Sequence, residues 1–250
     1  MGLRSLRRAT HDRTGYDDQL ARKRQLVDRA RNDVVAVEAG SDAAMAEAAA
    51  VVARAAGRSL DPARPALEAA ALLVPDDLCL LARRPAGWCL VAGVVCFPSM
   101  WRIGDKLGQS VTDLHAPVPG YAAELAARVD SVLDRLAADR PVWRRNWFVH
   151  DTPELHLPAT PPPHPSPAVP DDLRLRSEHQ TLRRLPSSGS ILFTIRTDMA
   201  PLSAVSGHPD VATGLRQAIA SWSPELVDYR SAARWRDGAL TWLAEVSVAP

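Results

Sequence analysis

The sequence lacks the apolar segments that mark membrane and secreted proteins. Its longest apolar runs, residues 69–74 and 88–98, are well short of the roughly 20 residues that a helix needs to cross a bilayer. The first 13 residues carry four arginines but not the apolar core of a secretory signal. We therefore expect no membrane partner and a cytoplasmic location.

Cysteine pairs, an excess of one charge and the common catalytic motifs are also missing. The three cysteines are an odd number without CxxC spacing, which argues against a disulfide framework and against a four-thiolate zinc or iron–sulfur site. Thirty basic against 29 acidic residues argue against a nucleic-acid partner. The sequence has no GxGxxG, GxxxxGK[ST], GxSxG or HExxH motif. Flavin, nicotinamide and common hydrolase sites are therefore not indicated.

What is present is typical of a folded protein. Of the 250 residues, 46% are apolar and 24% charged. The N-terminal part reads as helix: Asp17 and Asp18 suit a helix start, Ser41 an N-cap and Gly57 a left-handed C-cap. We predict a helical N-terminal extension over residues 1–60, followed by one domain over 61–250.

The rest of the chain predicts a mixed α/β fold with an antiparallel sheet between helices. Apolar runs predict a hairpin-like pair of strands at 78–82 and 88–97, and a three-to-four-residue stripe predicts a helix over 119–139. Further strands are expected at 142–149, 173–185 and 190–197, the last two joined by a tight turn. Six prolines make 160–170 a loop, and two C-terminal helices are expected to be separated near Pro224.

Three dense clusters could carry chemistry. The first runs from CFPSMW (96–101) to LHAPVP (114–119), where prolines on either side of Val118 hold His115 in a rigid frame. Such a histidine could present a neutral imidazole to a metal. The alternative is that His115 bonds a backbone group or caps the following helix.

The second cluster, 141–147, alternates tryptophan with arginine, and the third, 176–186, is rich in polar groups. Flat rings beside guanidinium groups suit a conjugated ligand that bears carboxylates, because arginine pairs with carboxylate bidentately. Tryptophans in a strand are also common core residues. Polar groups packed as densely as those of the third cluster need each other or a ligand.

Together the motifs CFPSMW, LHAPVP, RRNW and EHQTLRRLPSSGSILFTIRT resemble a bacterial family, the heme-dependent oxidative N-demethylase α subunits. The similarity spans residues 75–246. It implies a PAS-like fold that binds heme b and uses dioxygen and two electrons to demethylate a small amine such as dimethylamine, releasing formaldehyde. It also implies that the electrons come from NADPH through flavin and iron–sulfur partner subunits. The chain departs from the family pattern at His179 and is shorter over 149–170.

The resemblance suggests roles for individual residues. His115 is the expected axial ligand of the iron, and Cys96 is its rival, since a thiolate assists O–O cleavage but an apolar strand end opposes the thiolate. Glu178 could hold a protonated amine. The expected partners of the heme propionates are Lys106, Arg144, Arg183 and Arg184. The aromatic residues Phe97, Trp143 and Trp147 are candidates for the pocket walls, and the alternative is that they belong to the hydrophobic core.

Two other readings compete with the monooxygenase subunit. A non-catalytic PAS-like protein could bind or sense heme or another small ligand, because a fold does not settle a function. A structural partner that has lost heme would also fit the altered position at His179.

Overall fold

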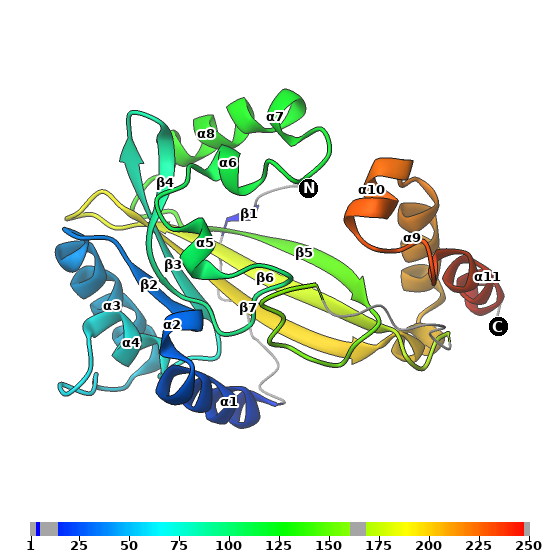
Figure 1. Cartoon of the computed structure of the whole chain (residues 1–250), viewed down its shortest axis with the longest axis horizontal. Coiled ribbons are helices and arrows are strands. Elements are labelled where there is room, and N and C mark those ends of the chain that lie inside the picture. The colour runs from blue at the N-terminus through cyan, green and yellow to red at the C-terminus, as the bar shows by residue number, and fades with distance from the viewer. Residues whose placement is uncertain (1–3, 6–14, 161–168, 248–250) are drawn as a thin grey trace.

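The computed structural model describes residues 4–5, 15–160 and 169–247 (Figure 1). The predicted loop at 160–170 lies mostly outside these residues. The described helices are α1 (Tyr16–Arg29), α2 (Arg31–Val34), α3 (Asp42–Ala56), α4 (Ala66–Ala71), α5 (Ile103–Lys106), α6 (Val111–Leu114), α7 (Tyr121–Glu124), α8 (Ala126–Arg135), α9 (Pro209–Ala220), α10 (Pro224–Tyr229) and α11 (Arg236–Ser247), with a 3₁₀ turn at Leu202–Gly207. The described strands are β1 (Arg4–Ser5), β2 (Val35–Val37), β3 (Asp77–Arg84), β4 (Gly87–Val94), β5 (Val142–His150), β6 (Arg174–Arg184) and β7 (Ile191–Pro201).

The strands form one sheet in the order β1-β5-β6-β7-β3-β4-β2, and every neighbouring pair is antiparallel. Both predicted hairpins, β3–β4 and β6–β7, are confirmed. The second closes over residues 186–189, where Gly189 adopts the left-handed conformation that the turn requires. The mixed α/β class is thus confirmed, and the PAS-like form of the sheet stays a prediction.

Helices cover both faces of the sheet near the β3–β4 hairpin. Leu78 and Leu80 point to one face and pack with residues of α1 to α4, such as Val27 and Ala48. Their neighbours Cys79 and Leu81 point to the other face and pack with Val111 of α6 and Leu133 of α8. Because successive side chains of a strand alternate between faces, one pair of strands contributes to two cores. Figure 1 shows α1–α4 below the sheet and α6–α8 above it.

The C-terminal helices form a third core at the far end of the long strands (Figure 1). Leu215, Ile219 and Leu243 of α9 and α11 pack there against Val149 and Leu173. The prediction of two helices is wrong in number, since the described residues after β7 form three, α9, α10 and α11. Ser223 caps α10 by accepting a hydrogen bond from the backbone N–H of Leu226, and Pro224 fits the first turn, where no N–H is needed.

Two further differences concern short elements. The helical N-terminal segment contains β2, which pairs with β4 at the edge of the sheet. The predicted helix over 119–139 is divided into α7 and α8 at Leu125 and ends at Arg135. At the predicted N-cap of α3, the Ser41 hydroxyl donates to the Val91 carbonyl instead of capping the helix, while Gly57 has the predicted left-handed conformation.

Residues before and after position 60 share one hydrophobic core, because Leu26 and Val52 pack in the same cluster as Leu67 and Leu192. The boundary at residue 60 stays a prediction. None of the helices in the described ranges has the length and apolar character needed to cross a membrane.

Candidate functional site

A row of polar side chains lies on one face of the central strands. Alternation along β6 places Arg176, Glu178 and Gln180 on the same face, and β5 adds Arg144 opposite Gln180. The three β6 residues are almost completely buried, with 0, 6 and 5% of their surface exposed. Buried polar groups need hydrogen-bond partners, and these residues supply them to one another.

The row begins at Arg176, whose guanidinium is anchored on every nitrogen. Nη1 donates to the Leu155 carbonyl, Nη2 to the Phe97 carbonyl and to the Thr197 hydroxyl, and Nε to Glu178 Oε1 at 3.1 Å. The other oxygen of Glu178 accepts from Gln180 Nε2 at 2.8 Å. Arg176 therefore fixes this end of the row and neutralises Glu178.

The row ends at Arg144, which is only half-buried. Its Nε donates to Gln180 Oε1 at 2.6 Å, and its two terminal nitrogens donate to none of the described residues. Burial lowers the pKa of Arg144, partly offset by the negative charge of Glu178. Because Arg176 already pairs with Glu178, Arg144 lacks an anion of its own, and a carboxylate is the group its planar fork binds best.

His115 lies near Arg144, at the end of α6. Ser110 caps this short helix by accepting from the Asp113 N–H, and His115 is the C-cap that follows its last residue, Leu114. Nδ1 of His115 is 2.7 Å from the Val111 carbonyl, which places the proton on Nδ1 and leaves Nε2 as a lone-pair donor. The imidazole also stacks on Tyr121 of α7, with ring centroids 4.4 Å apart and planes 10° apart.

The charge state of His115 suits a metal ligand. Burial lowers its pKa, the Val111 hydrogen bond opposes this, and the positive charges of Arg144 and Lys106 lower it further. The imidazole is therefore neutral at physiological pH. Nε2 has no hydrogen bond from the described residues, so it is available to a ligand.

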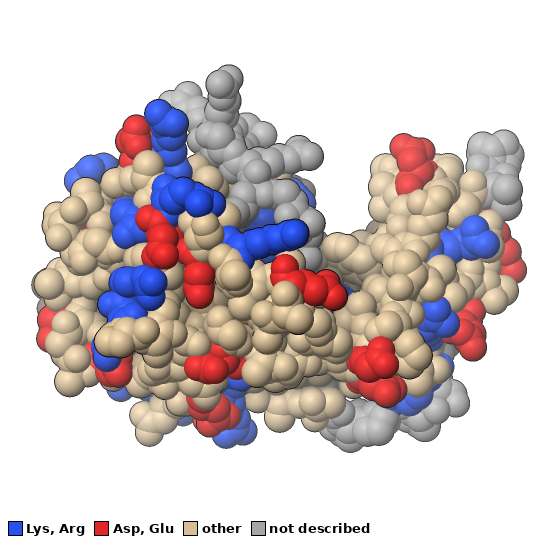
Figure 2. Space-filling view, turned by 90° about the horizontal axis from the view of Figure 1, so that it is seen from above, with Lys and Arg blue, Asp and Glu red and all other residues tan. Residues whose placement is uncertain are grey.

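A hollow in the surface lies between the two groups of helices that flank β5, the strand that carries Arg144. In Figure 1, α6 and α7 lie on one side of β5 and α10 on the other, and Figure 2 shows a hollow between the C-terminal helices and the rest of the molecule. Burial raises the pKa of Tyr229 on α10, the charge of Arg230 opposes this, and the carboxylate of Glu178 is near enough to raise it further. We call this region the β5 hollow.

A second polar group lies at the end of β5. His150 is 6% exposed, and its Nε2 is 3.3 Å from the Ser99 hydroxyl. Burial, with help from the charge of Arg176, lowers its pKa to about 4, so it too is neutral. His156 Nδ1 bonds to the Cys96 carbonyl at 2.8 Å.

The other predicted site residues lie elsewhere. Cys96 is completely buried among apolar side chains, and burial raises its thiol pKa to about 12. Phe97 belongs to the same core. Arg183, Trp143 and Trp147 point to the face of the sheet opposite Arg144, where Trp147 stacks on Trp222. The structure thus brings together Lys106, His115, Arg144 and Glu178, but not these five.

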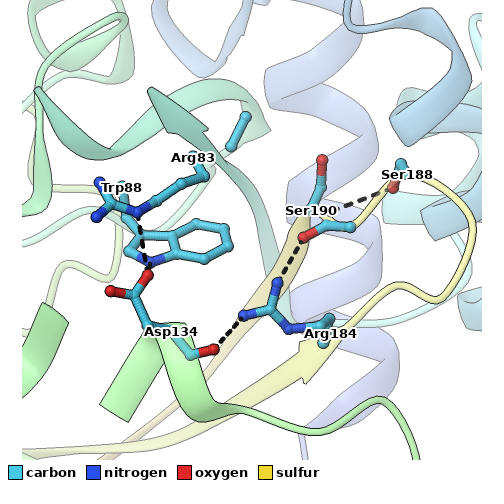
Figure 3. Close-up of a pocket in the computed structure, with 8 residues that line it drawn as sticks. Arg83, Trp88, Asp134, Arg184, Ser188 and Ser190 are labelled. Carbon is cyan, nitrogen blue, oxygen red and sulfur yellow. Dashed lines mark hydrogen bonds and ion pairs between the residues drawn. The ribbon is translucent and has the colours of Figure 1, made fainter. Parts of the chain in front are cut away.

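Arg184 lies at the opposite end of β6, beside a cavity of about 400 Å³ (Figure 3). All three of its guanidinium nitrogens donate to backbone carbonyls, those of Leu133, Asp134, Leu136 and Gly189. The guanidinium also lies 4.9 Å from the ring centre of Trp88. Arg184 therefore joins the end of α8 to the β6–β7 turn.

Sequence reasoning missed Gln180 and Tyr121 as site residues. Period 2 along 176–180 carried the signal for Gln180, because it puts this amide on the same face as Glu178. Tyr121 lies within the predicted helix over 119–139; in the structure it is the first residue of α7, after Gly120 with its positive φ, and it stacks on His115.

A protein-family model matches most of the chain. The family model described as haem-dependent oxidative N-demethylase, alpha subunit-like, matches residues 53–240, which include every residue of the polar row as well as His115. Among the described residues no group of three or more His, Cys, Asp or Glu could hold a bare metal ion.

Proposed function

This chain belongs to the haem-dependent oxidative N-demethylase alpha-subunit-like family, and from that premise we propose that it binds haem b in the β5 hollow. There it would serve as the oxygenase subunit that demethylates a small methylated amine. The observation that carries the proposal is the pairing of His115 and Arg144. Each has nitrogens that bond to none of the described residues, Arg144 is close enough to lower the pKa of His115, and together they match the iron and a propionate of haem.

The donor chemistry of His115 fits haem iron. A neutral imidazole whose Nδ1 is bound to a backbone carbonyl is the ordinary form of a proximal histidine, because that bond fixes the ring and leaves Nε2 for the metal. The Cys96 thiol fits less well, since its raised pKa opposes the thiolate that iron would need. We therefore assign the axial position to His115.

The cations of the hollow fit the propionates. Arg144 lacks an anionic partner, and Lys106 is near enough to lower the pKa of His115. A carboxylate placed on Arg144 would relieve the cost of half-burying an unpaired cation. Arg184 has its nitrogens on backbone carbonyls, and Arg183 lies on the other face of β6, so we do not assign them to haem.

The amine would enter beside Glu178. Each carboxylate oxygen has a second acceptor position beyond its bond to Arg176 or Gln180, so the group can still accept from a protonated amine. Bound haem would supply oxygen activation. With dioxygen, two electrons and two protons, the C–N bond would break, the methyl carbon would leave as formaldehyde with one oxygen atom, hydrogen would take its place on the nitrogen, and the other oxygen atom would leave as water. We assign the electron supply to partner subunits, by the NADPH, flavin and iron–sulfur route that the resemblance implies.

A haem titration tests the proposal. We expect hemin to give a stable Soret band with the wild-type protein and at least roughly tenfold weaker binding with His115→Gly, because the axial bond is lost. Added imidazole should restore the band of His115→Gly by occupying the vacated space. The matched control is His208→Ala, which removes an exposed histidine.

Three outcomes separate the readings. Absence of hemin uptake by the wild-type protein would contradict the proposal outright. Binding that is insensitive to His115→Gly would reject this ligand. Haem binding without formaldehyde release, when dithionite-reduced protein is mixed with dimethylamine and oxygen, would favour the non-catalytic sensor.

A further inference from the structure

Gln180 stands between two groups of opposite hydrogen-bonding character. Arg144 can only donate, and the Glu178 carboxylate accepts. Gln180 receives the first on Oε1 at 2.6 Å and donates to the second from Nε2 at 2.8 Å. Turning the amide over would place its NH₂ against the guanidinium and its oxygen against the carboxylate, so only one orientation is compatible with both neighbours.

The support behind Gln180 is rigid. Glu178 is held by Arg176, and each guanidinium nitrogen of Arg176 is bound to a carbonyl, a hydroxyl or Glu178 itself. Gln180 is 5% exposed, so water does not compete for its bonds. A continuous chain of hydrogen bonds therefore runs from Arg176 through Glu178 and Gln180 to Nε of Arg144, and it fixes the position of that nitrogen.

We propose that Gln180 is a positioning residue that orients the Arg144 guanidinium, so that its two terminal nitrogens face a carboxylate of the bound ligand. The inference rests on the proposed function and deepens it, because the carboxylate in question is a propionate of haem. An arginine held only through Nε keeps both Nη groups for a bidentate pair, which is the strong form of this interaction. Gln180 itself does not touch the ligand.

The test compares two ligands that differ only in the carboxylates, hemin and hemin dimethyl ester. The wild-type protein should bind hemin roughly tenfold more tightly than the ester, the order expected for a charge-assisted pair. Gln180→Leu should remove this preference by weakening hemin alone. Retained binding of the ester shows that the variant is folded. If Gln180 had a purely structural role, its replacement would weaken the binding of both ligands together.

Two further variants sharpen the test. In Arg144→Leu the preference for hemin should already be lost, and adding Gln180→Leu should change it no further, because Gln180 acts through Arg144. Thr181→Val is the matched control. Thr181 lies on β6 next to Gln180 but on the opposite face, and the variant removes its side-chain hydrogen bond to Thr194 of β7. It should keep the preference.

Each result decides a different statement. If the wild-type protein binds neither ligand, the proposed function fails. If it binds both equally, or if Gln180→Leu keeps the preference for hemin, haem binding stands and the role of Gln180 is overturned. Additive losses in the double variant would also overturn it.

Discussion

At the scale of single residues, burial sets the charge of the site. His115 and His150 both have lowered pKa values because desolvation disfavours the imidazolium form. Burial shifts the pKa of Asp77 in the opposite direction, because it disfavours the charged carboxylate. It raises this pKa to about 6, although Lys23 and two backbone N–H donors oppose the shift. The neutral imidazole that metal binding needs is thus a consequence of packing.

His150 gives a pH prediction. Its pKa is about 4 in the folded protein against roughly 6.5 unfolded, so the unfolded state binds more protons between these values. Its contribution to stability is complete above pH 6.5 and is lost as the pH falls toward 4, a total of about 3 kcal/mol. The free energy of unfolding in urea, measured at pH 7 and pH 4, should fall less for His150→Gln than for the wild-type protein.

The readout is the difference between the two proteins, because Asp77 has the opposite sign. Its raised pKa means that its contribution grows as the pH falls through 6. The exposed variant His208→Ala serves as control and should follow the wild-type dependence. Equal losses for wild type and His150→Gln would show that His150 titrates normally.

At the scale of elements, Arg184 explains how α8 is held. The last carbonyls of a helix have no partner within it, and Arg184 supplies donors to those of Leu133, Asp134 and Leu136. We expect Arg184→Leu to lower the free energy of unfolding by about 2 kcal/mol, the order for acceptors left without a charged donor. Hydrogen exchange should accelerate first in α8.

The neighbouring arginine provides the control for this prediction. Arg183 lies on the same strand but on the opposite face. Arg183→Leu should leave exchange in α8 unchanged. Equal protection of α8 in Arg184→Leu and the wild-type protein would show that the carbonyls do not depend on this side chain.

The elements also show what the sequence could predict. The hairpins were predictable because their turns carry local chemistry, such as the residues 186–189 before β7. The three-residue β2 was not, because its pairing with β4 depends on a contact distant in sequence. The predicted helix divides at Leu125, and no glycine or proline stands at this position to indicate the break.

The candidate site was predictable in part for the same reason. Motifs pointed to His115 and Arg144, but their approach depends on α6 and α7 folding over β5. Alternation along β6 could have separated Arg183 from Arg184. It could not have shown that the nitrogens of Arg184 go to backbone carbonyls.

At the scale of the molecule, the C-terminal helices form a unit with its own core. Their apolar side chains pack with one another and with the ends of β5 and β6, away from the two cores beside the β3–β4 hairpin. Arg230, which follows α10, fastens this unit to β5. Its Nη1 donates to the Trp147 carbonyl, and its Cζ lies 4.7 Å from the ring centre of Trp222 and 5.1 Å from that of Phe148.

This arrangement predicts that the C-terminal unit opens before the sheet does. Native-state hydrogen exchange should be faster in α9 and α11 than in β6 and β7, because separate cores permit separate openings. Arg230→Ala removes a partly desolvated cation–π contact and should raise exchange in the helices by roughly tenfold, with little effect on β6 and β7. Arg216→Ala, at an exposed position of α9, should change neither. Equal exchange of helices and strands in all three proteins would mean that the wall of the β5 hollow and its floor open as one unit.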